Sequence, residues 1–547
     1  MRVIFSRADL VYMWLGPSSD DVDRVMDFIS RVGPRAFASG VLDSKLHGRP
    51  GQEVHDYIKT RPPSNEVDTN DDTAGSELAR FYFDLLHERG LYAAPQGGLL
   101  TGIVDLLQRD YWHRIWIIQE VALAKDAVVM CGDRSVSLDM FDATFTAVWA
   151  CKTSGIFNLH PEYHGYGARL LSNMYGTSKP LITRSLRRRR DQIRLADILV
   201  ELSAAPKRPF YTASDPRDIV FGLLGVIDDR GKLGLRADYS MALVEVFSVL
   251  TRALIREGNE SSRRFDLDLC VPRREKADNL PTWVSDWRVV GKYGIRSFPI
   301  NHYHAFDATV GIPPPLLATN NVDCINFAVL RRPGCRVDVI KEVMPPPKRV
   351  QYDEWQRSQI ADANGWLSAV FNFAGLGPET SPGEDYVWRT IMCHKLRKYG
   401  QITVATSEDI AWLIRRIMRR ERVDISTLTE DQVEFIRRGL YDLSRAQPKL
   451  QTLRDQLAYV VHEWPEYLGA MNRDRTLFKT MKGMFGLGHV AIRAGDVVTL
   501  LWGVRSPIIL RPRECVGFEL VGDAYVDGIM HGEFLDTKPT EREFDIY

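Results

Sequence analysis

The segment from Ile115 to Ala124 restricts the fold more than any other, because it is apolar on nearly every face of a helix. Only Gln119 and Glu120 interrupt its run of Ile, Trp, Val, Ala and Leu residues. A helix of this kind has to be covered by other elements on all sides. The segment therefore predicts a buried helix within a layered domain, and it places a carboxylate where burial is costly unless a partner is present.

Glu120 has two interpretations. A desolvated carboxylate could serve as an acid, a base or a group that stabilises a developing positive charge. The alternative is a structural carboxylate held by Gln119, by an arginine, or by the amides at the start of a neighbouring helix. The local pattern by itself favours the structural interpretation.

Two short apolar runs predict strands of a parallel sheet. Val11 to Leu15 ends at Gly16-Pro17, and Ala127 to Cys131 ends at Gly132-Asp133, which is typical of buried strands followed by turns. Between them, Ser19 or Asp20 can cap a helix that Gly33-Pro34 should stop. If the first strand lies in a sheet buried on both faces, its further neighbours should come from elsewhere. The beginning of the chain is therefore predicted to be α/β.

The length of 547 residues exceeds what one core usually supports, so several units are expected. Residues 133–290 should form a helical extension that contains Asp215-Pro216-Arg217-Asp218 and the segment Leu280 to Trp287. Residues 291–480 read as a variable, mostly α-helical region. Short strands between Gly and Pro turns predict a small β-rich C-terminal unit over residues 481–547.

Composition excludes several classes of function. Lys+Arg and Asp+Glu both number 71, so the formal net charge is zero and nucleic-acid binding is not expected. No apolar run reaches the roughly 20 residues of a membrane span. The seven cysteines are scattered, which fits a reducing, cytoplasmic location. His160 and His164 flank Glu162 in what reads as an exposed loop, so no metal site is expected.

Several motifs together resemble one family. The pattern Tyr-Trp-x-Arg-x-Trp-x-x-Gln-Glu over residues 111–120 resembles a signature of the fungal heterokaryon-incompatibility (HET) domain. Further landmarks follow in the family's order: the strand at 11–16, Asp-Pro-Arg-Asp with Gly-Leu-Leu-Gly at 215–225, Leu-Pro-x-Trp-Val-x-Asp-Trp at 280–287, and a C-terminal block at 495–533. By this resemblance, residues 1–132 correspond to the C-terminal part of a HET domain.

The family is similar to the TIR fold, a flavodoxin-like parallel sheet with flanking helices. The resemblance implies a role in fungal non-self recognition and programmed cell death, a protein partner from an incompatible allele or locus, and a possible homo-oligomer. Some TIR domains cleave NAD with a glutamate in a Trp-x-x-x-Glu helix. Glu120 occupies that place, with Trp116 in support, and NAD would be a substrate rather than a cofactor.

The chain departs from the family before Val3. A complete HET domain would have two more strands there and a segment similar to W-I-D-x-x-C-I-N-Q, so we expect an N-terminally truncated domain with an incomplete parallel sheet. That segment would help to form the pocket, and catalysis is not expected for the sequence as it stands. A non-enzymatic interaction module and an inert truncated relative are the alternatives.

Overall fold

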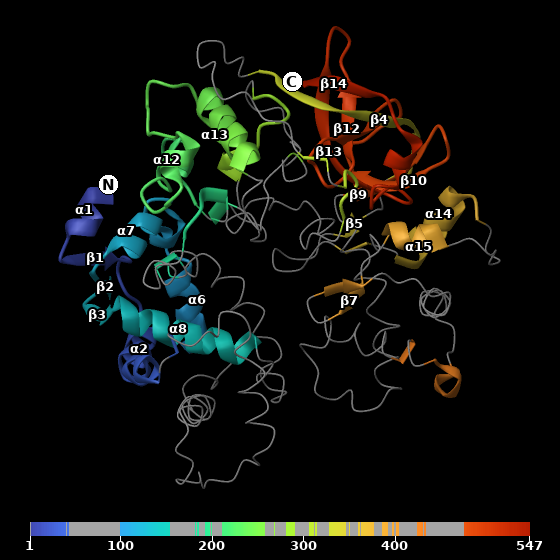
Figure 1. Cartoon of the computed structure of the whole chain (residues 1–547). Coiled ribbons are helices and arrows are strands. Elements are labelled where there is room, and N and C mark those ends of the chain that lie inside the picture. The colour runs from blue at the N-terminus through green and yellow to red at the C-terminus, as the bar shows by residue number, and fades with distance from the viewer. Residues whose placement is uncertain are drawn as a thin grey trace. The chain divides into compact units, whose positions relative to one another are not determined.

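Figure 1 shows the computed structural model of the chain. The structure describes residues 2–39, 41–42, 99–153, 181, 183–184, 192–196, 198–199, 211–257, 267, 280–289, 306–310, 312–313, 328–345, 349–350, 359–360, 363–376, 385–391, 396–398, 401–403, 424–429, 432–433 and 475–547.

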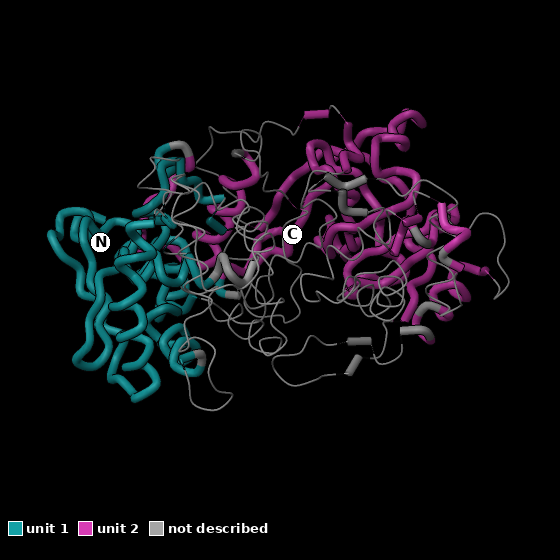
Figure 2. Tube along the Cα trace, turned by 90° about the horizontal axis from the view of Figure 1, so that it is seen from below, with its two compact units in different colours: residues 1–232, 288–294, 444–448 teal, residues 233–287, 295–443, 449–547 magenta. Residues whose placement is uncertain are grey.

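The chain divides into two compact units, coloured separately in Figure 2. Unit 1 comprises residues 1–232, 288–294 and 444–448, and unit 2 comprises the remainder. The domain boundaries inferred above from composition and motifs stay predictions. Most of the region predicted to be helical, residues 291–480, lies outside the described residues.

Unit 1 contains a small mixed sheet with helices packed against it. The strand order is β1-β2-β3, in which β1 and β2 run parallel and β3 returns antiparallel to β2. The strands are β1 (Leu10–Trp14), β2 (Asp126–Cys131) and β3 (Arg134–Ser137). The helices are α1 (Arg2–Arg7), α2 (Asp20–Ala38), α6 (Leu99–Leu107), η2 (Asp110–His113), α7 (Ile117–Leu123), α8 (Leu138–Thr153), α11 (Asp218–Phe221) and α12 (Arg230–Leu233). The two predicted strands are therefore confirmed as a parallel pair.

The β1 strand is buried on one face only. Val11 and Met13 are buried, whereas Leu10, Tyr12 and Trp14 on the opposite face are 40%, 67% and 52% exposed. In the described part of the molecule, β1 therefore does not meet the condition of a sheet buried on both faces, from which further neighbouring strands would have followed. β1 is buried on one face only because α2 and its neighbours cover a single face of the sheet.

Helix α2 begins as predicted but ends later. Ser19 is the N-cap, and its hydroxyl accepts a hydrogen bond from the Val22 amide. The predicted stop at Gly33-Pro34 is wrong, because the helix continues through Pro34 to Ala38. A Cβ on Gly33 would lie 2.7 Å from the Cβ of Met140 on α8. Gly33 therefore allows two helices to approach closely, and burial of that face keeps the helix intact past the proline.

Unit 2 is built around a β-barrel. Six strands close in the order β4-β11-β12-β13-β10-β9, because β10 pairs with both β9 and β13. At the other end of the barrel, β14 bridges β13 and β4. The strands are β4 (Leu330–Val343), β9 (Arg475–Thr480), β10 (Phe485–His489), β11 (Val497–Leu501), β12 (Ile508–Pro512), β13 (Phe518–Val526) and β14 (Glu541–Ile546).

Figure 1 shows β4, from the middle of the chain, among the red C-terminal strands. The predicted β-rich C-terminal unit is therefore confirmed in kind, but its wall also uses β4 and β9, which lie in the region predicted to be mostly helical. The prediction of helix is wrong for these two stretches. The reason is that β4 pairs with β9, β11 and β14, all of which lie more than a hundred residues later in the sequence. A local sequence pattern carries no information about such distant pairing.

Shorter elements complete unit 2. The helices are α13 (Leu243–Glu257), α14 (Ala363–Ala374), α15 (Asp385–Ile391), η8 (Ile425–Thr427) and η10 (Glu533–Thr537). The short η6 (Trp287–Val289) begins at the last residue of a unit 2 segment and continues into unit 1. Two small hairpins are formed by β5 (Arg349–Val350) with β6 (Gln359–Ile360) and by β7 (Leu396–Lys398) with β8 (Gln401–Thr403). The barrel interior is filled by side chains from most of its strands, among them Val337, Phe478, Val498 and Ile509.

Candidate functional site

The buried segment 111–124 forms a short 3-10 turn followed by helix α7. Ile117, Ile118, Gln119, Val121 and Ala122 of α7 are buried, which confirms the predicted burial of this segment. The regular helix is only seven residues long. Its first turn carries Glu120, so the position of this carboxylate is fixed by the packing of the residues around it.

Glu120 is half-buried and has a partner that the sequence analysis missed. The hydroxyl of Tyr111 donates a hydrogen bond of 2.7 Å to Glu120 Oε2. Burial, and then the negative charge of Glu120, raise the pKa of Tyr111 well above its usual value. The phenol therefore stays neutral and remains a donor. Tyr111 and Glu120 belong to the same sequence signature, and this was the one feature of the sequence that could have indicated their contact.

Trp116 and Gln119 hold α7 against the 215–225 segment. Trp116 Nε1 donates to Asp218 Oδ2 at 3.3 Å, and Gln119 Nε2 donates to the Gly222 carbonyl at 2.8 Å. Gly225 lies directly against the Gln119 carboxamide, because a Cβ there would be 2.2 Å from its Oε1. The two motifs at 111–124 and 215–225 are therefore halves of one packing arrangement.

Arg184 caps the C-terminal end of α7. Its side chain is 3% exposed, and its guanidinium donates to the carbonyls of Val121 (3.0 Å), Ala124 (2.5 Å) and Lys125 (3.2 Å). The carbonyls at a helix C-terminus lack intrahelical partners, and a cation there is favourable. Arg184 also lies 3.6 Å from Asp139. This arginine therefore fixes the register of α7, and nothing in the local sequence predicts it.

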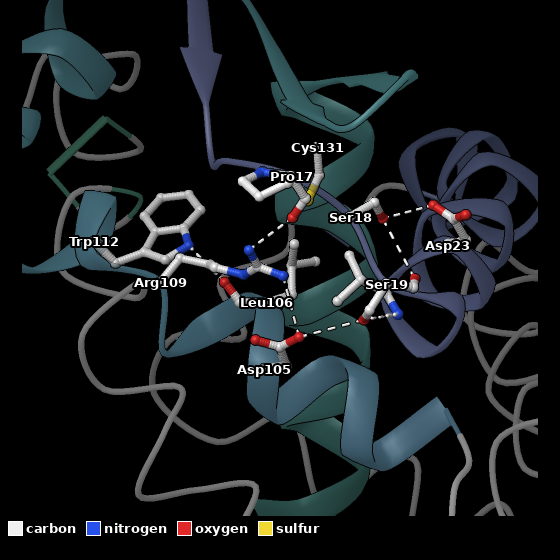
Figure 3. Close-up of polar contacts among 10 residues, drawn as sticks. Pro17, Ser18, Ser19, Asp23, Asp105, Leu106, Arg109, Trp112 and Cys131 are labelled. Carbon is white, nitrogen blue, oxygen red and sulfur yellow. Dashed lines mark hydrogen bonds and ion pairs between the residues drawn. The ribbon is translucent and has the colours of Figure 1, made fainter.

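A second polar cluster lies at the carboxyl ends of β1 and β2, which is the usual place for ligands in parallel sheets. Figure 3 shows Arg109 between the loop after β1 and helix α6. Arg109 donates to the Pro17 carbonyl at 2.8 Å and to Asp105 at 3.1 Å. Ser18 donates to Asp23 at 2.6 Å. The charges of Arg109 and Asp105 offset each other, so this cluster orders the loop after β1 rather than presenting a free cation.

Cys131 and Gly132 complete that cluster. Burial raises the pKa of the Cys131 thiol, which donates to the Pro17 carbonyl. Gly132 has φ +59°, and a Cβ there would lie 2.7 Å from the Ser18 Cβ, so only glycine suits this close approach. The two clusters are separate in their contacts. Glu120 is bonded to Tyr111, whereas Arg109 is bonded to Pro17 and Asp105.

Two searches of the described residues concern metal-binding clusters and membrane-spanning helices. Those residues contain no group of three or more His, Cys, Asp or Glu side chains that could hold a metal ion. His160 and His164 lie outside the described residues. Among the described helices, none is both long and apolar enough to cross a membrane.

Comparisons with known proteins agree with the motifs. A model of the Het-6 beta-barrel domain family matches residues 398–547. The chain is also 25% identical over 601 aligned positions to "Heterokaryon incompatibility protein 6, OR allele" of Neurospora crassa, and the alignment covers 100% of this chain and 79% of that protein. Both findings support a HET-domain protein. No solved structure matches it.

The match to the Het-6 beta-barrel domain family also bears on the barrel of unit 2. The matched residues include β9 to β14, whereas β4 lies before them. In the structure β4 pairs with β9, β11 and β14. The barrel is therefore closed by a strand from outside the matched range.

Proposed function

We propose that this chain acts in heterokaryon incompatibility, promoting cell death when it meets a protein partner from an incompatible allele or locus. The observation that carries the proposal is that a protein named for heterokaryon incompatibility aligns with the whole chain. The match of the C-terminal barrel to the Het-6 family supports it independently. The cytoplasm is the proposed location, because the scattered cysteines fit a reducing compartment.

Unit 1 is the proposed effector part. The parallel β1–β2 pair is joined by a long crossover whose described helices include α2, α6 and α7, and crossovers that contain helices join the parallel strands of flavodoxin-like sheets. This supports a TIR-like unit 1 with an incomplete parallel sheet. Trp116 and Gln119 would then serve to hold α7 in place, and unit 1 would act by binding other proteins.

A second candidate is NAD cleavage at Glu120, favoured by one observation: this carboxylate is only half-buried and is bonded to a neutral hydroxyl. In such a reaction the N-glycosidic bond to nicotinamide breaks, nicotinamide leaves with the electron pair, and water adds to the ribosyl carbon with loss of a proton. Glu120 would stabilise the positive charge that develops on the ribose. NAD would be consumed as substrate, and no cofactor is needed.

The test is expression of the chain in fungal recipients of different incompatibility type, with surviving transformants counted and cellular NAD measured. Killing in some recipients but not in others is expected, and survival in all of them would overturn the proposed function. Glu120→Gln removes the charge with little change of shape. Glu533→Gln, on an exposed 3-10 turn, is the matched control. If Glu120→Gln alone abolishes killing and NAD loss while the protein stays folded, cleavage is supported; unchanged killing supports the interaction mechanism.

A further inference from the structure

The two carboxylate oxygens of Glu120 have different surroundings. Oε2 accepts the hydrogen bond of 2.7 Å from the Tyr111 hydroxyl. In the part of the chain that the structure describes, no other hydrogen bond or ion pair reaches this carboxylate. Oε1 has no partner there and is not buried. One oxygen is therefore held inside unit 1, and the other is presented to solvent, where it can approach a positively charged centre.

The Tyr111 side chain is held by the core of unit 1. Its ring makes an edge contact with the ring of Trp112, and the two centroids are 5.4 Å apart. Trp112 is fully buried, its Nε1 donates to the Leu106 carbonyl at 3.0 Å, and its ring stacks on Phe141 of α8. The position of the Tyr111 hydroxyl is therefore set by packing that extends to α8, and not by Glu120 alone.

The Tyr111 hydroxyl also keeps its proton. Burial, and then the negative charge of Glu120, hold the pKa of Tyr111 well above its usual value, so the phenol stays a donor. A glutamate side chain has several rotatable bonds, and holding it in one orientation costs conformational entropy. A rigid donor on Oε2 meets this cost when the protein folds, before any substrate binds.

We propose that Tyr111 is a positioning residue for Glu120, whose hydroxyl holds Oε2 so that Oε1 is directed at the substrate. This inference rests on the proposed cleavage of NAD at Glu120. Tyr111 itself does not touch the substrate and takes no part in breaking the bond to nicotinamide. It acts through Glu120, by fixing the carboxylate against which the positive charge on the ribose develops.

The test measures the rate of NAD consumption by the purified full chain over a series of NAD concentrations. Tyr111→Phe removes the hydroxyl and keeps the ring that packs against Trp112. We expect kcat to fall by about 10- to 100-fold, because the carboxylate is no longer oriented. KM should stay within about twofold of the wild type, because the lost interaction acts in the transition state and not in substrate binding.

Tyr525→Phe is the matched control. Tyr525 is a buried tyrosine of unit 2, and its hydroxyl also donates to a carboxylate, Asp527 Oδ1, at 3.2 Å. The control removes the same kind of hydrogen bond and should leave kcat unchanged. Circular dichroism and the thermal midpoint of each variant show whether it is folded. A fall in kcat caused by reduced stability alone would appear in both variants.

The double variant Tyr111→Phe/Glu120→Gln separates positioning from an independent role. Because Tyr111 acts through Glu120, the double variant should be no slower than Glu120→Gln alone. A further loss as large as that of Tyr111→Phe in the wild type would overturn the positioning role. So would a Tyr111→Phe variant that keeps wild-type kcat, or one that no longer folds.

Failure of the positioning role and failure of cleavage give different results. A wild type that consumes no NAD refutes cleavage at Glu120, and the role of Tyr111 falls with it. A wild type that consumes NAD beside an equally fast Tyr111→Phe variant refutes positioning and leaves cleavage standing.

Discussion

Replacement of Gly225 by alanine tests whether the two motifs of unit 1 stabilise each other. The added carbon would lie 2.2 Å from Oε1, 2.4 Å from Cδ and 2.8 Å from Nε2 of Gln119. Gln119 is 2% exposed, so its carboxamide has no open space into which it can move. We therefore expect Gly225→Ala to push the amide aside and to break its hydrogen bond to the Gly222 carbonyl.

The size of the effect follows from three contributions. A buried polar group that loses its hydrogen bond costs about 1–3 kcal/mol. Overpacking by one methyl group costs about 1–3 kcal/mol. Reduced freedom of the unfolded chain returns about 0.4–1 kcal/mol when glycine becomes alanine. The net expectation is that Gly225→Ala lowers the free energy of unfolding of unit 1 by about 2–4 kcal/mol.

Urea unfolding followed by far-UV circular dichroism measures this change. Gly231→Ala is the matched control, because nothing lies within 4 Å of a Cβ at Gly231, and it should be neutral or slightly stabilising. Gln119→Ala combined with Gly225→Ala removes the obstacle and should be more stable than the two single effects added together. The packing argument fails if Gly225→Ala is no more destabilising than the control, or if the two changes are additive.

Two further predictions concern the barrel. Arg475 and Asp523 form a buried ion pair at 2.7 Å, and Arg475→Met should lower the free energy of unfolding by about 3–5 kcal/mol. Arg331→Met, at a 68% exposed side chain that pairs with Asp545, should lower the free energy of unfolding far less, because solvent screens an exposed ion pair. Equal losses in urea unfolding would contradict this. Burial acts to raise the pKa of Asp338, but hydrogen bonds from main-chain amides and a hydroxyl outweigh it and hold the pKa below its usual value. Its contribution to stability is present above the unfolded pKa of about 3.9 and is lost as the pH falls through the lower folded value. Asp338→Asn should therefore lower the thermal midpoint at neutral pH and approach the wild type in acid; a difference independent of pH would refute the role of this charge.

Several features of unit 1 could be predicted because they depend on neighbours in sequence. The β1 and β2 strands follow from short apolar runs, and the Ser19 cap follows from a side chain that reaches an amide three residues ahead. The stop predicted at Gly33-Pro34 failed because the packing of α8 at Met140 decides that position. Local rules apply only where no distant element competes with them.

The candidate site was predictable in identity but not in geometry. The signature singled out Glu120 and Trp116, yet their partners, Tyr111 and Asp218, appeared only in the structure. Asp218 lies 102 residues away from Trp116. A spacing of that length carries no periodic signal, so the pairing of the motifs could not be read from either of them.

The sequence by itself determined the family resemblance, the burial of the 115–124 segment, the parallel character of the first strands and the β-rich nature of the C-terminal end. It could do so because motif order and hydrophobic pattern are properties of the chain. The tertiary structure alone decided that β4 completes the barrel, that Arg184 holds the end of α7, and that one face of β1 stays exposed. Each of these depends on which distant surfaces meet, and the free energy of burial depends on that meeting rather than on the local sequence.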